Sequence, residues 1–200
     1  MRADIDASLV NTHYLQEQVV SYLDASQYRN RVVVSYEKEL RGTAGTLLAN
    51  LDFFGQDDVL LIHADNYCEA ELRDFVFAHN GRPAGCLMSM MTFRTQEPST
   101  CGIVELDEHN VVVGFHEKSS TPPGNLASGA VYLLTNELLM RLKSDFSTVK
   151  DFSTEVIHHF LGHIYSHEVF DAFLDVGTPE NYLRACKLAT ERALPAALAQ

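Results

Sequence analysis

The stretch DDVLLIHADNY, residues 57 to 67, decides the fold. Four consecutive apolar residues, Val59 to Ile62, follow two acids and end shortly before Asp65. A short uninterrupted apolar run is typical of a strand buried on both faces, as in parallel sheets. Such sheets bind ligands at the carboxyl ends of their strands, where Asp65 stands. A carboxylate there could hold a divalent cation against a phosphate, or it could cap a helix expected from about Glu69.

Composition places the chain among ordinary globular proteins. Its 200 residues are 46% hydrophobic and 10% aromatic, which is enough for one domain with a sizeable core. The formal net charge is −12, from 27 acids against 15 bases. This balance excludes the basic footprint of a general nucleic-acid or membrane-surface binder, so we expect neither as a partner.

The cysteine pattern bears on metal binding and on location. Four cysteines stand far apart and form no CxxC pair, which disfavours a zinc site or a redox dithiol. The chain shows neither a basic-then-apolar leader nor an apolar run of about 18 residues. We therefore expect reduced cysteines and a cytoplasmic location.

The rest of the chain alternates apolar runs with amphipathic segments. We expect strands at 8–11, 31–36, 84–93, 102–106, 111–116, 130–134 and 164–169. We expect helices at about 13–23, 46–54, 69–80, 135–142, 153–161 and 179–194. This alternation predicts an α/β fold with a mainly parallel sheet. Residues 1–200 form one domain in this prediction, with 179–200 as a C-terminal helix.

Three further groups could carry chemistry, and each has an ordinary structural alternative. The loop GTAG at 42–45 could bring backbone N–H groups to a phosphate, or it could be a simple turn. Glu117 and Lys118 could meet sugar hydroxyls and a phosphate, or they could be an exposed pair at an edge strand. Asp175 could be a second metal ligand or a turn-forming aspartate.

Taken in order, seven segments resemble the nucleotidyltransferases that activate sugar 1-phosphates. They are VNTHYL at 10–15, EKELRGTAG at 37–45, LIHAD at 61–65, CGIVE at 101–105, FHEK at 115–118, ASGAVY at 127–132 and FLDVGT at 173–178. The resemblance implies a Rossmann-like, three-layer αβα (GT-A-like) fold of the α/β class with a mixed, mainly parallel sheet. It also implies the reaction of an NTP with a sugar 1-phosphate, giving an NDP-sugar and pyrophosphate. It is somewhat closer to the guanylyl-transferring members that act on mannose or heptose 1-phosphate.

The resemblance also implies roles for individual residues. It assigns Mg²⁺ to Asp65 and Asp175, and it makes these two and Lys118 the catalytic residues. The nucleotide would be bound by Glu37, Gly42, Thr43, Ala44 and Asp65. The sugar phosphate would be bound by Gly102, Glu117, Lys118, Ser128 and Gly129. The partners are then the NTP and the sugar 1-phosphate, and assembly into a homo-oligomer is left open.

The sequence departs from the family at its start. The family opens with a strand and a glycine-rich loop that carries an arginine and grips the triphosphate, and neither is present here. The start resembles the family's second strand, so about one βα unit of roughly 30 residues is missing. We expect either a gap or a rearranged sheet with unpaired edges. The alternative to an enzyme is a degenerate or fragmentary, non-catalytic domain that binds a sugar nucleotide or a partner chain.

Overall fold

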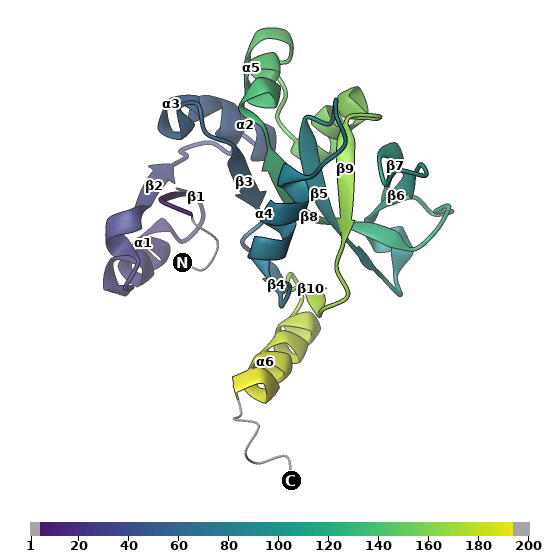
Figure 1. The fold of residues 1–200 in the computed structure, drawn as a ribbon. Coiled ribbons are helices and arrows are strands. Elements are labelled where there is room, and N and C mark those ends of the chain that lie inside the picture. The colour runs from purple at the N-terminus through teal and green to yellow at the C-terminus, as the bar shows by residue number, and fades with distance from the viewer. Residues whose placement is uncertain (1–4, 194–200) are drawn as a thin grey trace.

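One strand, β8 (Leu126–Leu134), organises the central sheet. In the computed structural model, which describes residues 5 to 193, β8 pairs antiparallel with three strands: β3 (Val59–Ile62), β5 (Met88–Arg94) and β6 (Gly102–Leu106). Two further strands extend the sheet on either side, namely β7 (Val112–Glu117) beside β6 and β9 (Ile164–Glu168) beside β5. The order is β7-β6-β8-β5-β9, with β3 attached to β8 (Figure 1).

Two small strand pairs stand apart from this sheet. The strands β1 (Ser8–Thr12) and β2 (Val32–Tyr36) form a parallel pair, and no strand pairing joins them to the large sheet within residues 5 to 193. This arrangement agrees with the expected interruption of the sheet. The strands β4 (Asn66–Cys68) and β10 (Phe173–Asp175) form an antiparallel pair that the sequence did not predict.

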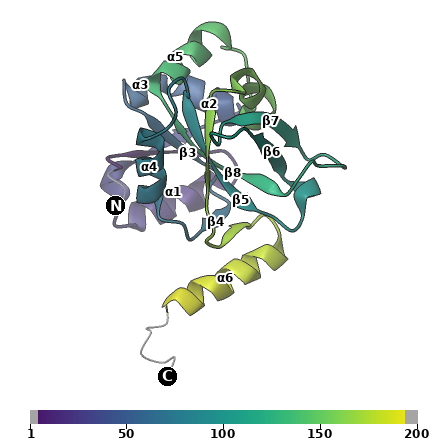
Figure 2. The same ribbon diagram turned by 45° about the vertical axis from the view of Figure 1, so that its right-hand side comes forward.

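Helices cover both faces of the large sheet (Figures 1 and 2). The helices within residues 5 to 193 are α1 (Gln16–Ala25), α2 (Thr43–Ala49), α3 (Leu51–Phe54), α4 (Leu72–Asn80), α5 (Asn136–Asp145) and α6 (Pro179–Ala193). Of these, α1 lies against β2 and α6 against β10, outside the large sheet. Single 3₁₀ turns occur at Arg29–Arg31 and Pro98–Thr100. None of the helices within residues 5 to 193 is both long and apolar enough to cross a membrane.

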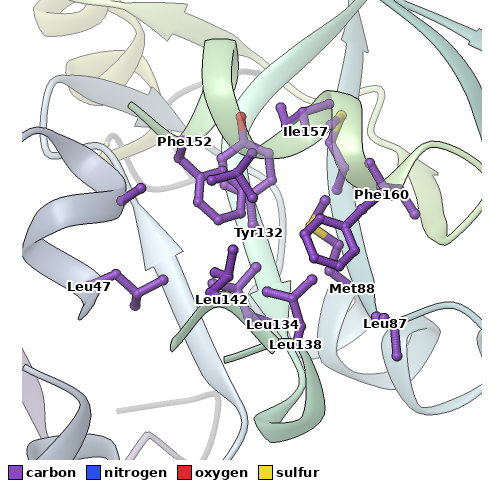
Figure 3. Close-up of a cluster of buried hydrophobic side chains, with 14 of the residues drawn as sticks. Leu47, Leu87, Met88, Tyr132, Leu134, Leu138, Leu142, Phe152, Ile157 and Phe160 are labelled. Carbon is purple, nitrogen blue, oxygen red and sulfur yellow. The ribbon is translucent and has the colours of Figure 1, made fainter. Parts of the chain in front are cut away.

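The side chains of β8 alternate between two hydrophobic clusters. Tyr132 and Leu134 belong to the larger core cluster, which includes residues of α2 and α5. Val131 and Leu133 belong to the smaller core cluster, which includes Phe75 of α4. Because successive strand residues point to opposite faces, the clusters lie on opposite sides of the sheet. Figure 3 shows the larger core cluster and its buried side chains. The expected three-layer α/β class is confirmed.

The direction of the strands differs from the prediction. Only the pairs β1–β2 and β5–β9 are parallel, whereas the other five pairs in residues 5 to 193 are antiparallel. The sheet is mixed as expected, but it is not mainly parallel. An apolar run such as Val59 to Ile62 reports that helices cover both faces of the strand, and it carries no information about the direction of the neighbouring strand.

Local boundaries also differ where short-range signals compete. The helix expected from Glu69 begins only at Leu72, after β4, so Asp65 does not cap it. The segment expected as a helix at 153–161 is a π-helical turn, Phe152–Val156, followed by a 3₁₀ turn, Ile157–Phe160. The final helix is present as α6, while the expected residue 194 lies outside the described residues.

We predict that Leu138→Ala destabilises the protein by weakening the larger core cluster. Leu138 of α5 is fully buried, so truncation leaves a cavity and lowers the free energy of unfolding by about 2–5 kcal/mol. Met140 on the same helix is 41% exposed, and Met140→Ala should change it by about 0.5 kcal/mol or less. Urea unfolding of both variants measures the difference. Equal effects would contradict the assignment of Leu138 to the core.

Candidate functional site

The strand pair β4–β10 brings Asp65 and Asp175 together. Asn66, which follows Asp65, pairs with Asp175 across the two strands. The carbonyl oxygen of Asp65 also accepts a hydrogen bond from the N–H of Val176 at 2.8 Å. Both aspartates are exposed. Although the two stand 110 positions apart in the sequence, the fold places their backbones side by side at one end of the β4–β10 pair.

Asp175 also makes a local turn. Its Oδ1 accepts a hydrogen bond from the N–H of Gly177 at 2.7 Å, which is the turn-forming arrangement that the sequence left open. A carboxylate has two oxygens and can accept several hydrogen bonds or metal contacts. The turn therefore orients the Asp175 carboxylate without using up its capacity to bind a ligand.

We call residues 65–66 and 175–176 the aspartate edge. A hydrogen bond joins this edge to β8. The side-chain nitrogen Nδ2 of Asn66 donates to the carbonyl oxygen of Gly129 at 2.9 Å. A Cβ at Gly129 would lie 2.8 Å from a carbon of the Phe173 ring, so only glycine allows this close approach. The next residue, Ala130, has a φ of 50° at the point where the register of β8 against β5 shifts. This bulge turns Gly129 toward the aspartates.

The predicted sugar-binding residues lie on three neighbouring strands. Gly102 of β6 pairs with Glu117 of β7, and Ile103 of β6 pairs with Ala127, the neighbour of Ser128 on β8. A Cβ at Gly102 would come within 2.7 Å of Oε2 of Glu117, so the carboxylate lies directly over the glycine. Lys118 follows with a φ of 44° and donates its N–H to the carbonyl of Cys101 at 3.1 Å. A lysine held in the left-handed region is uncommon and marks a constrained position.

The environment of Glu117 changes its protonation. Burial raises the pKa of its carboxyl above the ordinary value for glutamate; the Lys118 charge opposes the rise, Asp151 adds to it and His158 opposes it. Nearby, the hydroxyl of Tyr132 lies 3.1 Å from Oγ of Ser128. Tyr132 is fully buried, so the groups that a sugar hydroxyl could reach are the half-buried carboxyl of Glu117 and the half-buried hydroxyl of Ser128.

The predicted nucleotide-binding residues are held differently. Glu37 is 1% exposed, and its carboxylate accepts hydrogen bonds from the hydroxyl of Thr46 and, at 3.2 Å, from the N–H of Arg41. The Ala44 side chain is fully buried. Gly42 has a φ of 78° and precedes the first residue of α2, Thr43. Glu37 thus supports the segment before α2 from inside the protein, and the side chains of Glu37 and Ala44 do not face solvent.

Residues 150–152, which the sequence analysis did not single out, connect residues 42–45 to the strands that carry the predicted sugar-binding residues (the sugar side). The carbonyl of Lys150 accepts hydrogen bonds from the N–H groups of Ala44 and Gly45, at 2.8 and 3.2 Å. Two residues later, the N–H of Phe152 donates to Oγ1 of Thr43 at 2.8 Å. The Phe152 ring packs on Tyr132, with ring centroids 4.9 Å apart, as Figure 3 shows. No sequence pattern signals the hydrogen bonds to Ala44, Gly45 and Thr43, because each joins residues more than 100 positions apart.

The predicted site residues therefore fall into two groups, which are linked to one another in different ways. Direct contacts between the strands join the aspartate edge to Gly129 and place Gly102 beside Glu117. The loop at 37–45 reaches the sugar side only through residues 150–152, and no hydrogen bond within residues 5 to 193 joins it to Asp65 or Asp175.

The donor chemistry at the aspartate edge suits magnesium. Asp65 and Asp175 offer hard carboxylate oxygens, and Mg²⁺ is commonly held by one or two carboxylates together with substrate phosphates and water. Within the described residues no group of three or more His, Cys, Asp or Glu side chains could hold a metal ion. Two aspartates at an exposed edge therefore fit a cation that arrives with a phosphate ligand, rather than one enclosed entirely by the protein.

Comparison with known proteins agrees with this fold. The chain matches the family model described as nucleotidyl transferase over residues 1–192. The chain belongs to this family. Among relatives, it is 23% identical to a Sulfolobus acidocaldarius protein provisionally named mannose-1-phosphate guanyltransferase, over 91% of this chain and 50% of the relative. It is 30% identical to a glucose-1-phosphate adenylyltransferase of Thermotoga neapolitana, over 72% of this chain and 37% of the relative.

Solved structures of this nucleotidyl transferase fold superpose well on the chain. A Bacillus anthracis protein provisionally named glucose-1-phosphate thymidylyltransferase gives a TM-score of 0.81 at 20% identity, covering 96% of this chain and 78% of that one. HddC from Yersinia pseudotuberculosis gives a TM-score of 0.77 at 18% identity, covering 94% and 80%. At these identities the likeness shows the fold alone. The chain spans half or less of the length of the two curated relatives.

We predict that Gly129→Ala destabilises the link between β8 and β10. The added methyl group would overlap the buried Phe173 ring, and such overpacking costs about 1–3 kcal/mol of unfolding free energy. Gly124→Ala is the matched control, because a Cβ at Gly124 meets nothing within 4 Å. Adding Phe173→Leu to Gly129→Ala should recover part of the loss. Thermal unfolding of the four proteins tests the contact, and an unchanged Gly129→Ala variant would contradict it.

Proposed function

We propose that the chain carries the active site of a sugar-1-phosphate nucleotidyltransferase. An oxygen of the sugar 1-phosphate attacks the α-phosphorus of an NTP, the bond to the β-phosphate oxygen breaks, and NDP-sugar and pyrophosphate result. The observation that carries the proposal is the backbone contact that places Asp65 beside Asp175. The Asn66 hydrogen bond to Gly129 links that pair to the strands of Glu117 and Lys118. Membership of the nucleotidyl transferase family supports it.

The chain's own residues contribute mainly by positioning and by charge. The ammonium group of Lys118 is exposed at the end of β7, where it would pair with the phosphate of the sugar 1-phosphate. Glu117, Ser128 and the backbone around Gly102 and Gly129 would accept and donate hydrogen bonds to the sugar. Gly42 and Thr43, at the start of α2, would lie beside the nucleotide base. Holding the two phosphates in line is the greater part of catalysis in such transfers.

Magnesium would be held by Asp65 and Asp175, and when bound it would supply positive charge to the reacting phosphates. The role of these carboxylates is to hold that cation where the NTP and the sugar phosphate meet. The base, with guanine favoured, and the sugar, with mannose or heptose favoured, are parts of the same proposal. So is a cytoplasmic setting, which suits the four unpaired cysteines.

We predict that Asp65→Asn and Asp175→Asn each lower kcat about 100-fold or more, because loss of one carboxylate weakens the charge arrangement at the phosphates. The measurement is pyrophosphate release from a panel of NTPs and sugar 1-phosphates. Asp57→Asn, at the opposite end of β3, is the matched control and should keep full activity. Circular dichroism confirms that each variant is folded.

The same assay separates the enzyme from the non-catalytic alternative. If the folded chain turns over no pair of substrates, catalysis by this chain is refuted. Calorimetric titration with NDP-sugars then decides the rest, since binding without turnover supports a domain that only binds a sugar nucleotide.

We predict an acid-sensitive KM for the sugar 1-phosphate that depends on Glu117. Only the carboxylate form accepts two sugar hydroxyls fully, and the raised pKa of Glu117 means that this form is lost at a higher pH than for an ordinary glutamate. As the pH falls, KM should therefore rise early in the wild type. Glu117→Gln should have a higher KM with a flatter pH profile, since only titration of the substrate phosphate persists. Glu105→Gln, at an exposed site on β6, should behave like the wild type.

A further inference from the structure

Two histidines lie between the helix α4 and the large sheet. His79, in the last turn of α4, is 2% exposed, and His167 of β9 is half-buried. Ser89 and His167 stand on the same face of the sheet, because Met91, two residues after Ser89 on β5, pairs with His167. This is the face that α4 covers (Figure 1). The layer beneath this helix therefore contains two titratable rings beside the smaller core cluster.

The ring of His79 has a polar group on each side. Its Nδ1 lies 2.8 Å from the hydroxyl oxygen of Ser89, which is fully buried. Its Nε2 lies 3.4 Å from Oδ2 of Asp58 and has no hydrogen-bond partner among the described residues. A neutral imidazole has one N–H and one acceptor nitrogen. Because an acceptor nitrogen would be repelled by the carboxylate, the geometry places the N–H on Nε2 and makes Ser89 the donor to Nδ1.

This arrangement opposes the uptake of a second proton by His79. A proton on Nδ1 would reverse the hydrogen bond, so the hydroxyl hydrogen of buried Ser89 would lose its acceptor. The guanidinium of Arg82 donates hydrogen bonds to the carbonyls of Cys86 and His79, at 2.9 and 2.8 Å, and this fixed charge would repel a charged ring. Burial lowers the pKa of His79, the Arg82 charge lowers it further, and the Asp58 carboxylate opposes the fall.

His167 contacts α4 one turn earlier. Its ring centroid lies 5.8 Å from that of Phe75, which is fully buried in the smaller core cluster. Burial lowers the pKa of His167 as well, and the charge of Asp74 on α4 opposes the fall. Positions 75 and 79 lie on one face of the helix. A proton on either histidine therefore weakens the packing of the same helix face.

The packing of α4 also supports the aspartate edge. Phe75 belongs to the smaller core cluster together with Val131 and Phe173. Phe173 lies against Gly129 and stands two residues before Asp175 on β10. Withdrawal of Phe75 would remove part of the apolar support of β10. A change in α4 thus reaches the residues that precede the predicted metal ligands.

We propose that α4 is a pH-sensitive element, which opens from the sheet when His79 and His167 take up protons while the larger core cluster stays folded. Local opening of one helix is a common cooperative event in native proteins. Because both histidines have a lowered pKa when folded, the open form binds protons more readily than the closed form. The stability of the closed form is undiminished above the ordinary histidine pKa of about 6.5 and declines as the pH falls below it. This inference goes beyond the proposed catalysis and does not rest on it.

The test measures amide hydrogen exchange in the full chain at about pH 7.5 and about pH 5. Each exchange rate is divided into the intrinsic rate of an unstructured peptide at the same pH, which gives a protection factor. Protection factors at residues 75–80 should fall by about tenfold or more in acid, since each proton preferred by the open form contributes up to about tenfold per pH unit. The amides of β6 and β8 should retain their protection.

Replacement of the two rings separates this mechanism from other effects of acid. His79→Gln keeps an acceptor for Ser89 but cannot be protonated, and His167→Phe keeps a ring against Phe75. Each variant should lose about half of the change in the logarithm of the protection factor, and the double variant nearly all of it. His109→Gln is the matched control, because the His109 side chain is 71% exposed, and it should respond like the wild type.

A nitrogen NMR titration of the wild type checks the first step without any variant. The neutral ring of His79 should carry its N–H on Nε2, and it should titrate below the ordinary histidine range. This measurement keeps the proposal testable even where the double variant does not fold.

Three results would overturn the proposal. Titration of His79 at or above the ordinary histidine pKa would mean that Asp58 stabilises the charged ring in the closed form. Equal loss of protection in α4, β6 and β8 would mean that acid unfolds the whole chain at once. An unchanged acid response in the folded double variant would assign the effect to other groups. Failure of pyrophosphate release would affect none of these measurements, so the two proposals fail separately.

Discussion

Hydrogen bonding along β8 is the constraint on which the rest of the structure depends. Residues 131–134 pair with β3, residues 132–134 and 126–128 pair with β5, and Ala127 also pairs with β6. One strand can pair with three neighbours because the partner opposite β5 changes from β6 to β3 at the bulge near Ala130. The same bulge brings Gly129 against the Phe173 ring of β10, so the strand that organises the sheet also joins it to the aspartate edge.

Some of this architecture was predictable because it depends on local patterns. The apolar run at Val59–Ile62 and the strand Gly102–Leu106 were both identified from the sequence and occur with those bounds. Burial on both faces leaves a continuous apolar run, which the sequence shows directly. That the backbones of Asp65 and Asp175 would lie close together was expected only through resemblance to a family. Neither residue's immediate neighbours indicate that the two would meet.

Other features depend on contacts that no local pattern records. The strands β4 and β10 have three residues each and exist because they pair with one another, so neither has a periodicity of its own. The hydrogen bond from Phe152 to Thr43 spans 109 positions. Antiparallel pairing was missed because both strand directions give the same apolar pattern. Asp65 is an example of what local sequence patterns cannot decide. Its alternative role as a helix cap is removed only by the presence of β4, which precedes the helix.

The segment from Lys150 to Phe152 could couple the binding of two ligands. It contacts the loop at 42–45 through its backbone and the sugar side through the Phe152 ring. Any ligand that orders this segment from one side lowers the entropic cost of ordering it from the other. Such coupling is reciprocal by thermodynamic necessity, so each ligand would change the affinity for the other by the same factor. If the proposed nucleotide and sugar phosphate bind on the two sides of this segment, three consecutive residues give a physical route by which each ligand changes the affinity for the other without touching it.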